Sequence, residues 1–303
     1  RIKLIMKIVF DIYKRYFMPQ LKIFIELTRL TKPIGFMLLF WPCSWGLASA
    51  YKLDQNLYLF LIHLILFFLG AVLMRSAGCI VNDIVDKDYD KKVERTKLRP
   101  LAAGKISVKK SLLYVLILCF FAFLILIQFN FFTIILGLGS MFFAFTYPFM
   151  KRITYWPQLF LGLTFNWGIV IGWTSIIPNI TIDILVLYIS AIFWTLAYDT
   201  IYGAQDMSDD EIIGVKSTSI KFKDNMKLFI SINYLISSIC LIYFFRNYIG
   251  LNFLTIFLIF FYLTLIWQVI KFNKNDALNC LNTFKVNNYS GMILFITILM
   301  INI

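Results

Sequence analysis

The sequence predicts an all-α protein that crosses a membrane many times, a polytopic bundle of nine transmembrane helices. Of its 303 residues, 60% are hydrophobic and 18% are aromatic, and the mean hydropathy is +0.80. A soluble domain cannot cover so much apolar surface with polar residues. The apolar runs approach the roughly 20 residues that a helix needs to cross a bilayer, and none shows the alternation of a membrane β-barrel.

Residues 1–32 form a basic segment ahead of the first apolar run. Eight of them are basic: Arg1, Lys3, Lys7, Lys14, Arg15, Lys22, Arg29 and Lys32. Basic residues spaced among apolar ones are typical of an amphipathic helix that lies on an anionic membrane surface. Because Asp11 interrupts the apolar stretch and no small-residue cleavage site follows, we expect this segment to be retained rather than removed as a signal peptide.

Nine apolar stretches follow, and we expect them to form one transmembrane domain over residues 33–303. Their ranges are 34–50, 57–81, 111–129, 131–149, 157–177, 182–203, 227–245, 250–270 and 289–303. The last is the shortest, and it has little more than the minimum length for a span.

The distribution of Lys and Arg predicts the orientation of these helices. With nine helices, 26 of the 29 basic residues fall in the N-terminal segment and in the loops that follow even-numbered helices. Only Lys52 and Arg246 fall in the opposite loops, and Arg75 falls inside a helix. Since cytoplasmic loops carry the excess of basic residues, we expect the N-terminus in the cytoplasm. The same bias accounts for the net charge of +13, so no nucleic-acid partner is expected.

Acidic residues are scarce, and ten of the sixteen fall in two short segments, 83–94 and 199–211. These segments follow the second and sixth helices, so they lie on the same face of the membrane. In a continuing helix, three side chains of each segment share one stripe, within about 80° in the first and about 40° in the second. The two rows are Asn82, Asp86 and Asp90, and Asp199, Asp206 and Asp210. Asp83 and Asp88 point away from the first row.

Carboxylates in a row at a membrane boundary repel one another and need a positive partner. Hard oxygen ligands suit Mg²⁺, which is commonly shared between carboxylates and the phosphates of a substrate. The only histidine, His63, lies in an apolar run, and the five cysteines show no CxxC spacing, so a zinc or haem site is not expected. The competing interpretation is a solvated loop whose acids only balance nearby basic residues.

Basic and aromatic side chains near the acid rows are candidates for substrate binding. Arg75 is an intramembrane arginine, which is by default a functional candidate, and Lys151 and Arg152 lie on the same face as the acids. Such groups can hold phosphate oxygens, arginine in bidentate fashion. Tyr147 and Tyr202 are among the aromatic residues nearest the polar helix ends, where a ring can shelter a cation.

The acid rows stand within longer segments, 28–47, 73–107, 147–168, 194–218 and 284–295. These segments closely resemble the 4-hydroxybenzoate polyprenyltransferases of ubiquinone synthesis, within the UbiA superfamily. The first row matches the NDxxDxxxD motif of that family, and Asp199 matches its YDxxY element. The resemblance runs through essentially the whole chain.

The resemblance implies nine transmembrane helices around a central cavity that opens to lipid. It implies Mg²⁺-dependent transfer of a polyprenyl group from polyprenyl diphosphate to the 4-hydroxybenzoate ring carbon ortho to the phenol, giving 3-polyprenyl-4-hydroxybenzoate. By position, the metal ligands so implied are Asn82, Asp86, Asp90, Asp206 and Asp210. The same carboxylates with Asp199 are the implied catalytic residues, and Arg75, Lys151 and Arg152 match basic positions of the family.

Other interpretations stay open at this point. Members of the superfamily also prenylate naphthoates, chlorins or haem, and a transporter of a different class could place acids in a polytopic bundle. A bacterial inner membrane is the expected location, because no Arg- and Ser-rich transit peptide precedes the first helix. The alternative is the mitochondrial inner membrane.

Overall fold

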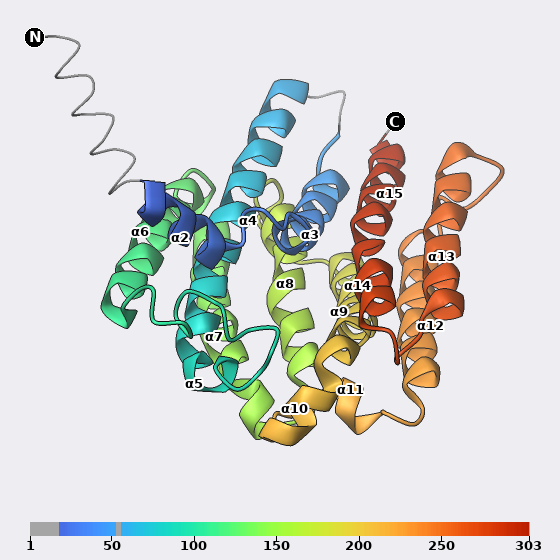
Figure 1. Ribbon diagram of the computed structural model, residues 1–303. Helices are drawn as coiled ribbons and strands as arrows, with labels where there is room; N and C mark the ends of the chain where they lie inside the picture. The colour runs from blue at the N-terminus through green and yellow to red at the C-terminus, as the bar shows by residue number, and fades with distance from the viewer. Residues whose placement is uncertain (1–17, 53–55, 303) are drawn as a thin grey trace, which may run out of the picture. The chain divides into compact units, whose positions relative to one another are not determined.

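The computed structural model describes residues 18–52 and 56–302, and this part of the chain contains helices and no strand (Figure 1). The predicted all-α class is therefore confirmed. The chain divides into two compact units, which are described separately below: Arg1–Pro33 with Leu73–Phe121, and Ile34–Val72 with Ala122–Ile303. The prediction of a single domain over 33–303 stays a prediction. Most of the predicted amphipathic segment, residues 1–17, lies outside the described residues.

The α-helices have these bounds: α2 Met18–Thr28, α3 Ile34–Ala50, α4 Leu57–Val85, α5 Lys87–Asp90, α6 Val108–Leu126, α7 Phe131–Ile153, α8 Pro157–Thr174, α9 Ile182–Gly203, α10 Met207–Ile213, α11 Thr218–Lys221, α12 Met226–Phe244, α13 Phe253–Lys271, α14 Ala277–Lys285 and α15 Asn287–Leu299. Two short 3-10 turns, Ala204–Asp206 and Met300–Asn302, continue α9 and α15.

In the described residues, seven helices are long and apolar enough to cross a membrane by length and composition, and α3 is a shorter apolar helix. The 18-residue helix α8 occupies the range of the remaining predicted span. The polytopic bundle is confirmed, whereas the exact count of nine stays a prediction. The predicted last span, 289–303, was too short, because the helical stretch begins at Ala277 and continues to Asn302.

The first unit is built around the end of α4. Its hydrophobic core joins α2, α4, α6 and the loop before α6, and it consists of Leu27, Ala77, Ile80, Leu101, Ile106, Val115 and Leu118. Leu101 is fully buried although it lies in the loop. Backbone hydrogen bonds give that loop a fixed path, for example from Arg99 N to Thr96 O and from Ala103 N to Arg99 O. The loop is therefore anchored rather than free, and it holds the residues around Leu101 in place.

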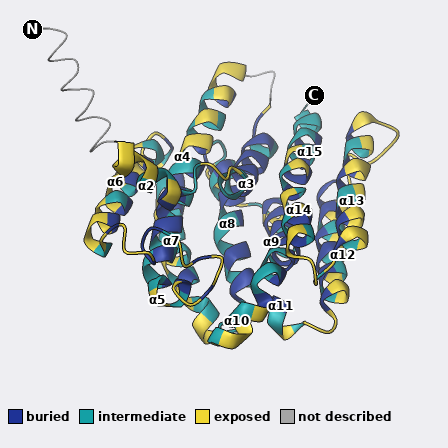
Figure 2. Cartoon of the chain, viewed as in Figure 1, coloured by how far each residue is buried: buried dark blue, intermediate teal, exposed yellow. Residues whose placement is uncertain are grey.

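In the second unit, six long helices pack side by side in a closed ring. Each helix contacts the next in the order α3, α8, α9, α12, α13 and α15, and α15 returns to α3. Helix α7 packs outside the ring against α8. Figure 2 shows that α8 and α9 are buried along most of their length, while α13 carries many exposed residues.

Close packing of α3 against α8 depends on small residues, as is typical of helix pairs in membranes. A Cβ atom built on Gly172 would lie well inside the van der Waals distance of the Cys43 carbonyl oxygen and 2.8 Å from Leu47 N. Both neighbours are backbone atoms of α3, so they cannot rotate away. The two helices can approach this closely only with glycine at position 172.

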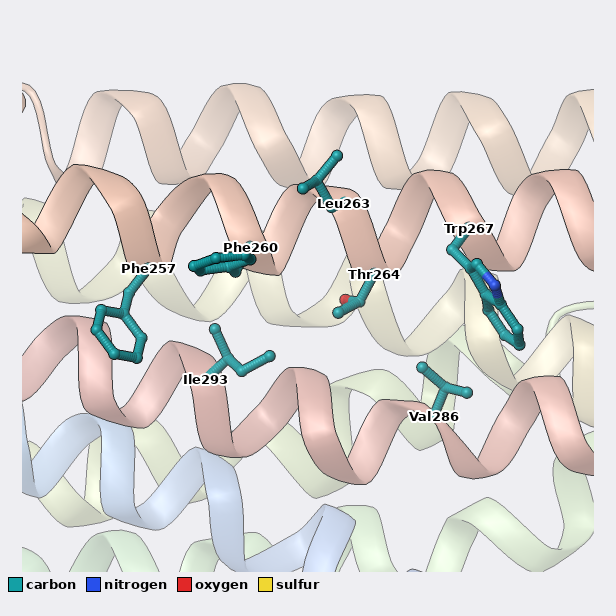
Figure 3. Close-up of a pocket in the computed structure, with 7 residues that line it drawn as sticks. All are labelled: Phe257, Phe260, Leu263, Thr264, Trp267, Val286 and Ile293. Atoms are coloured by element: carbon teal, nitrogen blue, oxygen red, sulfur yellow. The ribbon is translucent and has the colours of Figure 1, made fainter.

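A shallow apolar groove of about 430 Å³ lies between α13 and the α14–α15 stretch (Figure 3). Its lining residues are Phe257, Phe260, Leu263, Thr264, Trp267, Val286 and Ile293. Phe260, Leu263 and Trp267 are exposed, which is expected of a helix face turned to lipid. The groove contains none of the predicted site residues, and the predicted central cavity stays a prediction.

The packing of α3 on α8 gives a stability prediction. Gly172→Ala should destabilise the protein by about 1–3 kcal/mol, because the added methyl group overpacks a contact between two backbones. The measurement is thermal unfolding of the purified protein in detergent. The matched control is Gly139→Ala in α7, where a Cβ atom would meet nothing within 4 Å. That control should be neutral or stabilising by up to about 1 kcal/mol, and equal destabilisation by both variants would contradict the packing argument.

Candidate functional site

The first acid row lies at the end of α4, in the first unit. Backbone hydrogen bonds run from Asp86 N to Asn82 O and from Asp90 N to Asp86 O, both at 2.8 Å. The three residues therefore stand on successive helical turns. The helix nevertheless breaks at Asp86, whose φ and ψ are −92° and 1°, and the short helix α5 follows. Asp86 and Asp90 are both buried.

An ion-pair network surrounds this row. Arg99 donates to both carboxylate oxygens of Asp90, at 3.0 and 2.9 Å. The same guanidinium lies 3.3 Å from Asp83, which also accepts a 2.6 Å hydrogen bond from Arg29. Asp83 is only 2% exposed. Two arginines and two carboxylates are thus joined next to the predicted metal ligands.

Asp88 behaves differently from its neighbours. Its side chain is exposed and pairs with Lys91 at 3.0 Å. The hydrogen bond from Lys91 holds the pKa of Asp88 below its usual range. Asp88 therefore belongs to the solvated surface, as the stripe arithmetic predicts, and it provides a matched control for the buried acids of the same segment.

The second acid row lies at the end of α9, in the second unit, and repeats the backbone pattern of the first. Asp206 has φ and ψ of −107° and 6° and marks the break between α9 with its 3-10 turn and the short helix α10. Asp210 follows four residues later, as Asp90 follows Asp86. Gly214, with φ of +74°, then ends α10 in the left-handed conformation. Asp199, Asp206 and Asp210 are all half-buried.

Buried hydrogen bonds fix the end of α9. Gln158, at the start of α8, accepts from the backbone N–H of Thr218 at 3.0 Å. Thr200 and Thr218 share a hydroxyl–hydroxyl hydrogen bond of 2.7 Å, and Ser219 donates to Thr200 O at 2.8 Å. A Cβ atom on Gly203 would lie 2.6 Å from Ser219 Oγ, so a side chain there would displace the hydroxyl that donates to Thr200 O. This polar contact holds α11 against the helix turn that precedes Asp206.

The end of α7 lies beside the chain that follows α10. Lys216 N donates to Lys151 O at 2.8 Å, and Lys216 Nζ donates to Ile153 O at 3.2 Å. Val215 N in turn donates to Asp210 O at 2.9 Å. Within the second unit, the backbone around Lys151 and Arg152 is therefore only a few residues from the second acid row. Arg75 is half-buried on α4, in the first unit.

A column of aromatic rings leads through the second unit to the end of α9. Neighbouring ring centroids are 5.2 Å apart for Trp45 and Trp194, 4.8 Å for Trp194 and Tyr198, and 5.7 Å for Tyr198 and Phe284. Phe284 then packs against Tyr202 at 4.6 Å. Tyr202, predicted as a substrate-binding residue, thus ends this column one turn before Asp206. Tyr147 is half-buried on α7.

In the described part of the chain, no three His, Cys, Asp or Glu side chains lie close enough together to hold a metal by protein ligands alone. Mg²⁺ is usually held by one or two carboxylates together with waters and substrate phosphates. Each acid row offers one such carboxylate pair, Asp86 with Asp90 and Asp206 with Asp210. The donor set therefore suits Mg²⁺, although the meeting of both rows at one metal site stays a prediction.

Fold and site together define a polytopic helical membrane protein with a DxxxD pair at the end of each of two membrane helices. The chain matches the model of the UbiA prenyltransferase family over residues 39–296. It belongs to this family, and its class of enzyme is a prenyltransferase. The recognition made from the sequence segments is thereby confirmed.

Sequence relatives narrow the comparison. The mitochondrial 4-hydroxybenzoate polyprenyltransferase of Caenorhabditis elegans is 40% identical over 285 residues, which is 91% of this chain and 78% of the relative. The human protein of that name is 48% identical over 211 residues, 69% of this chain and 56% of the human one. 4-Hydroxybenzoate geranyltransferase 2 of Lithospermum erythrorhizon is 41% identical over 94% of this chain and 92% of its own. The match covers only about half of the human protein.

Solved structures share the fold at low sequence identity. A UbiA homologue from Aeropyrum pernix has a TM-score of 0.73 at 22% identity, covering 89% of this chain and 98% of its own. A UbiA homologue from Archaeoglobus fulgidus, solved with GPP and Mg²⁺, has a TM-score of 0.70 at 16% identity, covering 92% of this chain and 99% of its own. These likenesses establish the membrane fold.

The sequence does not single out three groups that the structure places at the first acid row. Helical periodicity turns Asp83 away from the stripe, Arg29 is one of eight basic residues in the N-terminal segment, and Arg99 is one of nine basic residues in the loop after the second predicted helix. The signal that could have found Asp83 is its place beside Asn82 in an otherwise apolar helix, where a lone carboxylate needs a partner.

The polar contact at the end of α9 gives a second prediction. Gln158→Leu should destabilise the protein by about 1–3 kcal/mol, because it leaves the buried Thr218 N–H without its acceptor. It should also speed hydrogen exchange in residues 217–221. Gln128→Leu is the matched control, since Gln128 is exposed just after α6 and its side chain donates to Leu124 O of that helix. The control should stay within about 0.5 kcal/mol of the parent protein. Unchanged exchange in Gln158→Leu would contradict the assigned role.

Proposed function

We propose that the protein transfers a polyprenyl group from polyprenyl diphosphate to 4-hydroxybenzoate, at the ring carbon ortho to the phenol, in a Mg²⁺-dependent reaction. The observation that carries this proposal is the pair of DxxxD motifs, each on a broken helix end, in a chain 40–48% identical to proteins named 4-hydroxybenzoate polyprenyltransferase. Membership of the family supports prenyl transfer as the reaction, and the names of the relatives support 4-hydroxybenzoate as the acceptor.

The metal would be held by oxygen atoms of both acid motifs: Asn82, Asp86, Asp90, Asp206 and Asp210. When bound, Mg²⁺ would supply positive charge that stabilises the diphosphate as it leaves. The A. fulgidus homologue solved with GPP and Mg²⁺ supports this choice of metal and donor. Asp199 would complete the second row, one turn above the 3-10 turn that ends at Asp206.

The basic residues would bind the diphosphate oxygens that the metal does not take. Lys151 and Arg152 lie at the cytoplasmic end of α7 by the charge count, Arg75 lies inside α4, and each can donate to phosphate. Ionisation of the allylic C–O bond adds negative charge to the diphosphate, so their positive charge stabilises the leaving diphosphate more strongly than the bound ester. That difference is the condition for accelerating ionisation.

The aromatic column would lie near the allylic carbon of the prenyl group and keep water away from it. Breaking the allylic C–O bond leaves a carbocation, and the half-buried Tyr202, backed by the buried rings of Phe284 and Tyr198, can stabilise such a cation while excluding water. The electron-rich phenol ring then attacks through its ortho carbon, and loss of the ring proton restores aromaticity. Tyr147 would contribute from α7.

A membrane location fits the substrate. A polyprenyl tail is insoluble in water, whereas its diphosphate is charged, so an enzyme whose acid motifs lie at the ends of apolar helices can bind both parts at once. The relatives named mitochondrial fit a mitochondrial inner membrane, and a bacterial inner membrane remains the other proposed location. The bilayer is part of the site in either case.

The direct test uses membranes that contain the protein, labelled 4-hydroxybenzoate, a polyprenyl diphosphate and Mg²⁺. Label should enter the lipid extract, and EDTA should abolish the transfer by removing the metal. Added Mg²⁺ should restore it. Transfer to another aromatic acceptor but not to 4-hydroxybenzoate would correct the substrate, and transfer that persists in EDTA would contradict the metal requirement.

Neutralising the acids tests the site itself. Asp86→Asn and Asp210→Asn should each lower prenyl transfer by about 100-fold or more, because each removes a charged oxygen ligand from the metal–diphosphate complex. Asp88→Asn and Glu211→Gln are matched controls, since both acids pair with exposed lysines, Lys91 and Lys223. The controls should keep activity within about twofold. Full activity in both Asp86→Asn and Asp210→Asn would contradict the assignment.

A further inference from the structure

Asp83 stands next to the predicted metal ligand Asn82, and its own contacts are cationic. Its carboxylate is buried and lies 2.6 Å from Arg29 Nη2 and 3.3 Å from Arg99 Nη1. Two guanidinium groups already compensate its charge. A carboxylate held between two guanidinium groups is well suited to hold the two arginines in place.

Arg99, which Asp83 holds, also contacts Asp90 of the first acid row. Its Nη1 atom contacts both oxygens of Asp90 at 3.0 and 2.9 Å, and these two charge-assisted hydrogen bonds restrain the orientation of the carboxylate. Thr96 Oγ1 also donates to Asp90 O at 3.0 Å, which ties the loop to the same residue. The side chain of Asp90 is thus oriented by a loop arginine that Asp83 orients in turn.

Arg29 adds an independent observation. Its φ is +55°, and it is the only non-glycine residue with positive φ among the described residues. It directly follows α2, where glycine is the usual residue in this conformation. An arginine there costs about 1 kcal/mol relative to glycine, and the 2.6 Å contact with buried Asp83 explains why the side chain is needed.

We propose that Asp83 is a positioning residue that couples Arg29 to the first acid motif. Through Arg29 and Arg99 it holds α2, the end of α4 and the loop before α6 together, so that Asp90 is oriented before substrate binds. This inference rests on the proposed diphosphate site. It adds that an arginine 54 residues before Asp83 contributes to that site without binding the metal.

The first test needs neither metal nor substrate. Hydrogen exchange is measured on the purified, metal-free protein in detergent for Asp83→Ala, Arg29→Ala and the double variant. Each single variant should speed exchange in residues 86–103 by about tenfold, which a lost coupling of about 1.4 kcal/mol would produce. Residues 131–153 should be unchanged. The double variant should resemble either single one, because both lose the same contact.

The second test uses steady-state kinetics with geranyl diphosphate. Asp83→Ala and Arg29→Ala should raise its KM by about tenfold and leave the KM for 4-hydroxybenzoate within twofold. Arg29→Lys should restore most of the effect, because it keeps a charged donor. Asp88→Ala is the control from the same segment and should behave as the parent protein. A purely structural role would lower the amount of active protein and leave both KM values unchanged.

Three results would overturn the inference. Additive effects in the double variant would mean that Asp83 and Arg29 act separately. A raised Mg²⁺ requirement in Asp83→Ala that Arg29→Ala does not share would make Asp83 a metal ligand. Unchanged exchange in residues 86–103 would remove the positioning role. If the parent protein prenylates no 4-hydroxybenzoate, the proposed function fails, and the exchange experiment still decides the role of Asp83.

Discussion

The cost of burying carboxylates at the ends of apolar helices shapes this protein. A charge taken out of water costs several kcal/mol unless a partner and further hydrogen bonds compensate it. At the first acid row the compensation is visible as Arg29 and Arg99 around Asp83 and Asp90. Removing one member leaves the others uncompensated, so the network has to be retained as a whole. The structure around α4 follows from this requirement.

In the second unit, buried polar groups are compensated by neutral hydrogen-bond partners rather than by ion pairs. Where α9 ends and α11 begins, backbone and side-chain groups are buried close together and need partners. Gln158, Thr200, Thr218 and Ser219 satisfy one another across three helices. Because every member is neutral, the contact can be rigid without adding charge near the second acid row.

Much of the fold could be predicted from the sequence, because span length and hydropathy are set by the bilayer rather than by tertiary detail. Helices α3 and α9 have the predicted bounds, Ile34–Ala50 and Ile182–Gly203. The last span was misjudged because Ala277–Lys285 is too polar to be recognised by hydropathy. The acid stripe could be predicted from helical periodicity, but which arginine meets which acid could not. Arg29 and Asp83 are 54 residues apart, and twelve other basic residues lie nearer to Asp83 in the sequence.

The helix breaks at Asp86 and Asp206 place the second aspartate of each DxxxD pair on a separate short helix, rather than along one face of a single helix. In a straight helix, the second carboxylate would stand about 6 Å further along the same axis, with its direction set by the membrane helix. Both breaks place the first aspartate near φ −90° and ψ 0°, a sparsely populated region in which many active-site residues lie. The hydrogen bond from Asp90 N to Asp86 O is kept at 2.8 Å, so the two aspartates stay one turn apart. The direction of the second aspartate is no longer set by the axis of the membrane helix. The short helices α5 and α10 can then be oriented by their own loops, as Arg99 orients Asp90. In each motif, the membrane helix fixes the depth of the first aspartate in the bilayer. The separate short helix sets the direction of the second carboxylate.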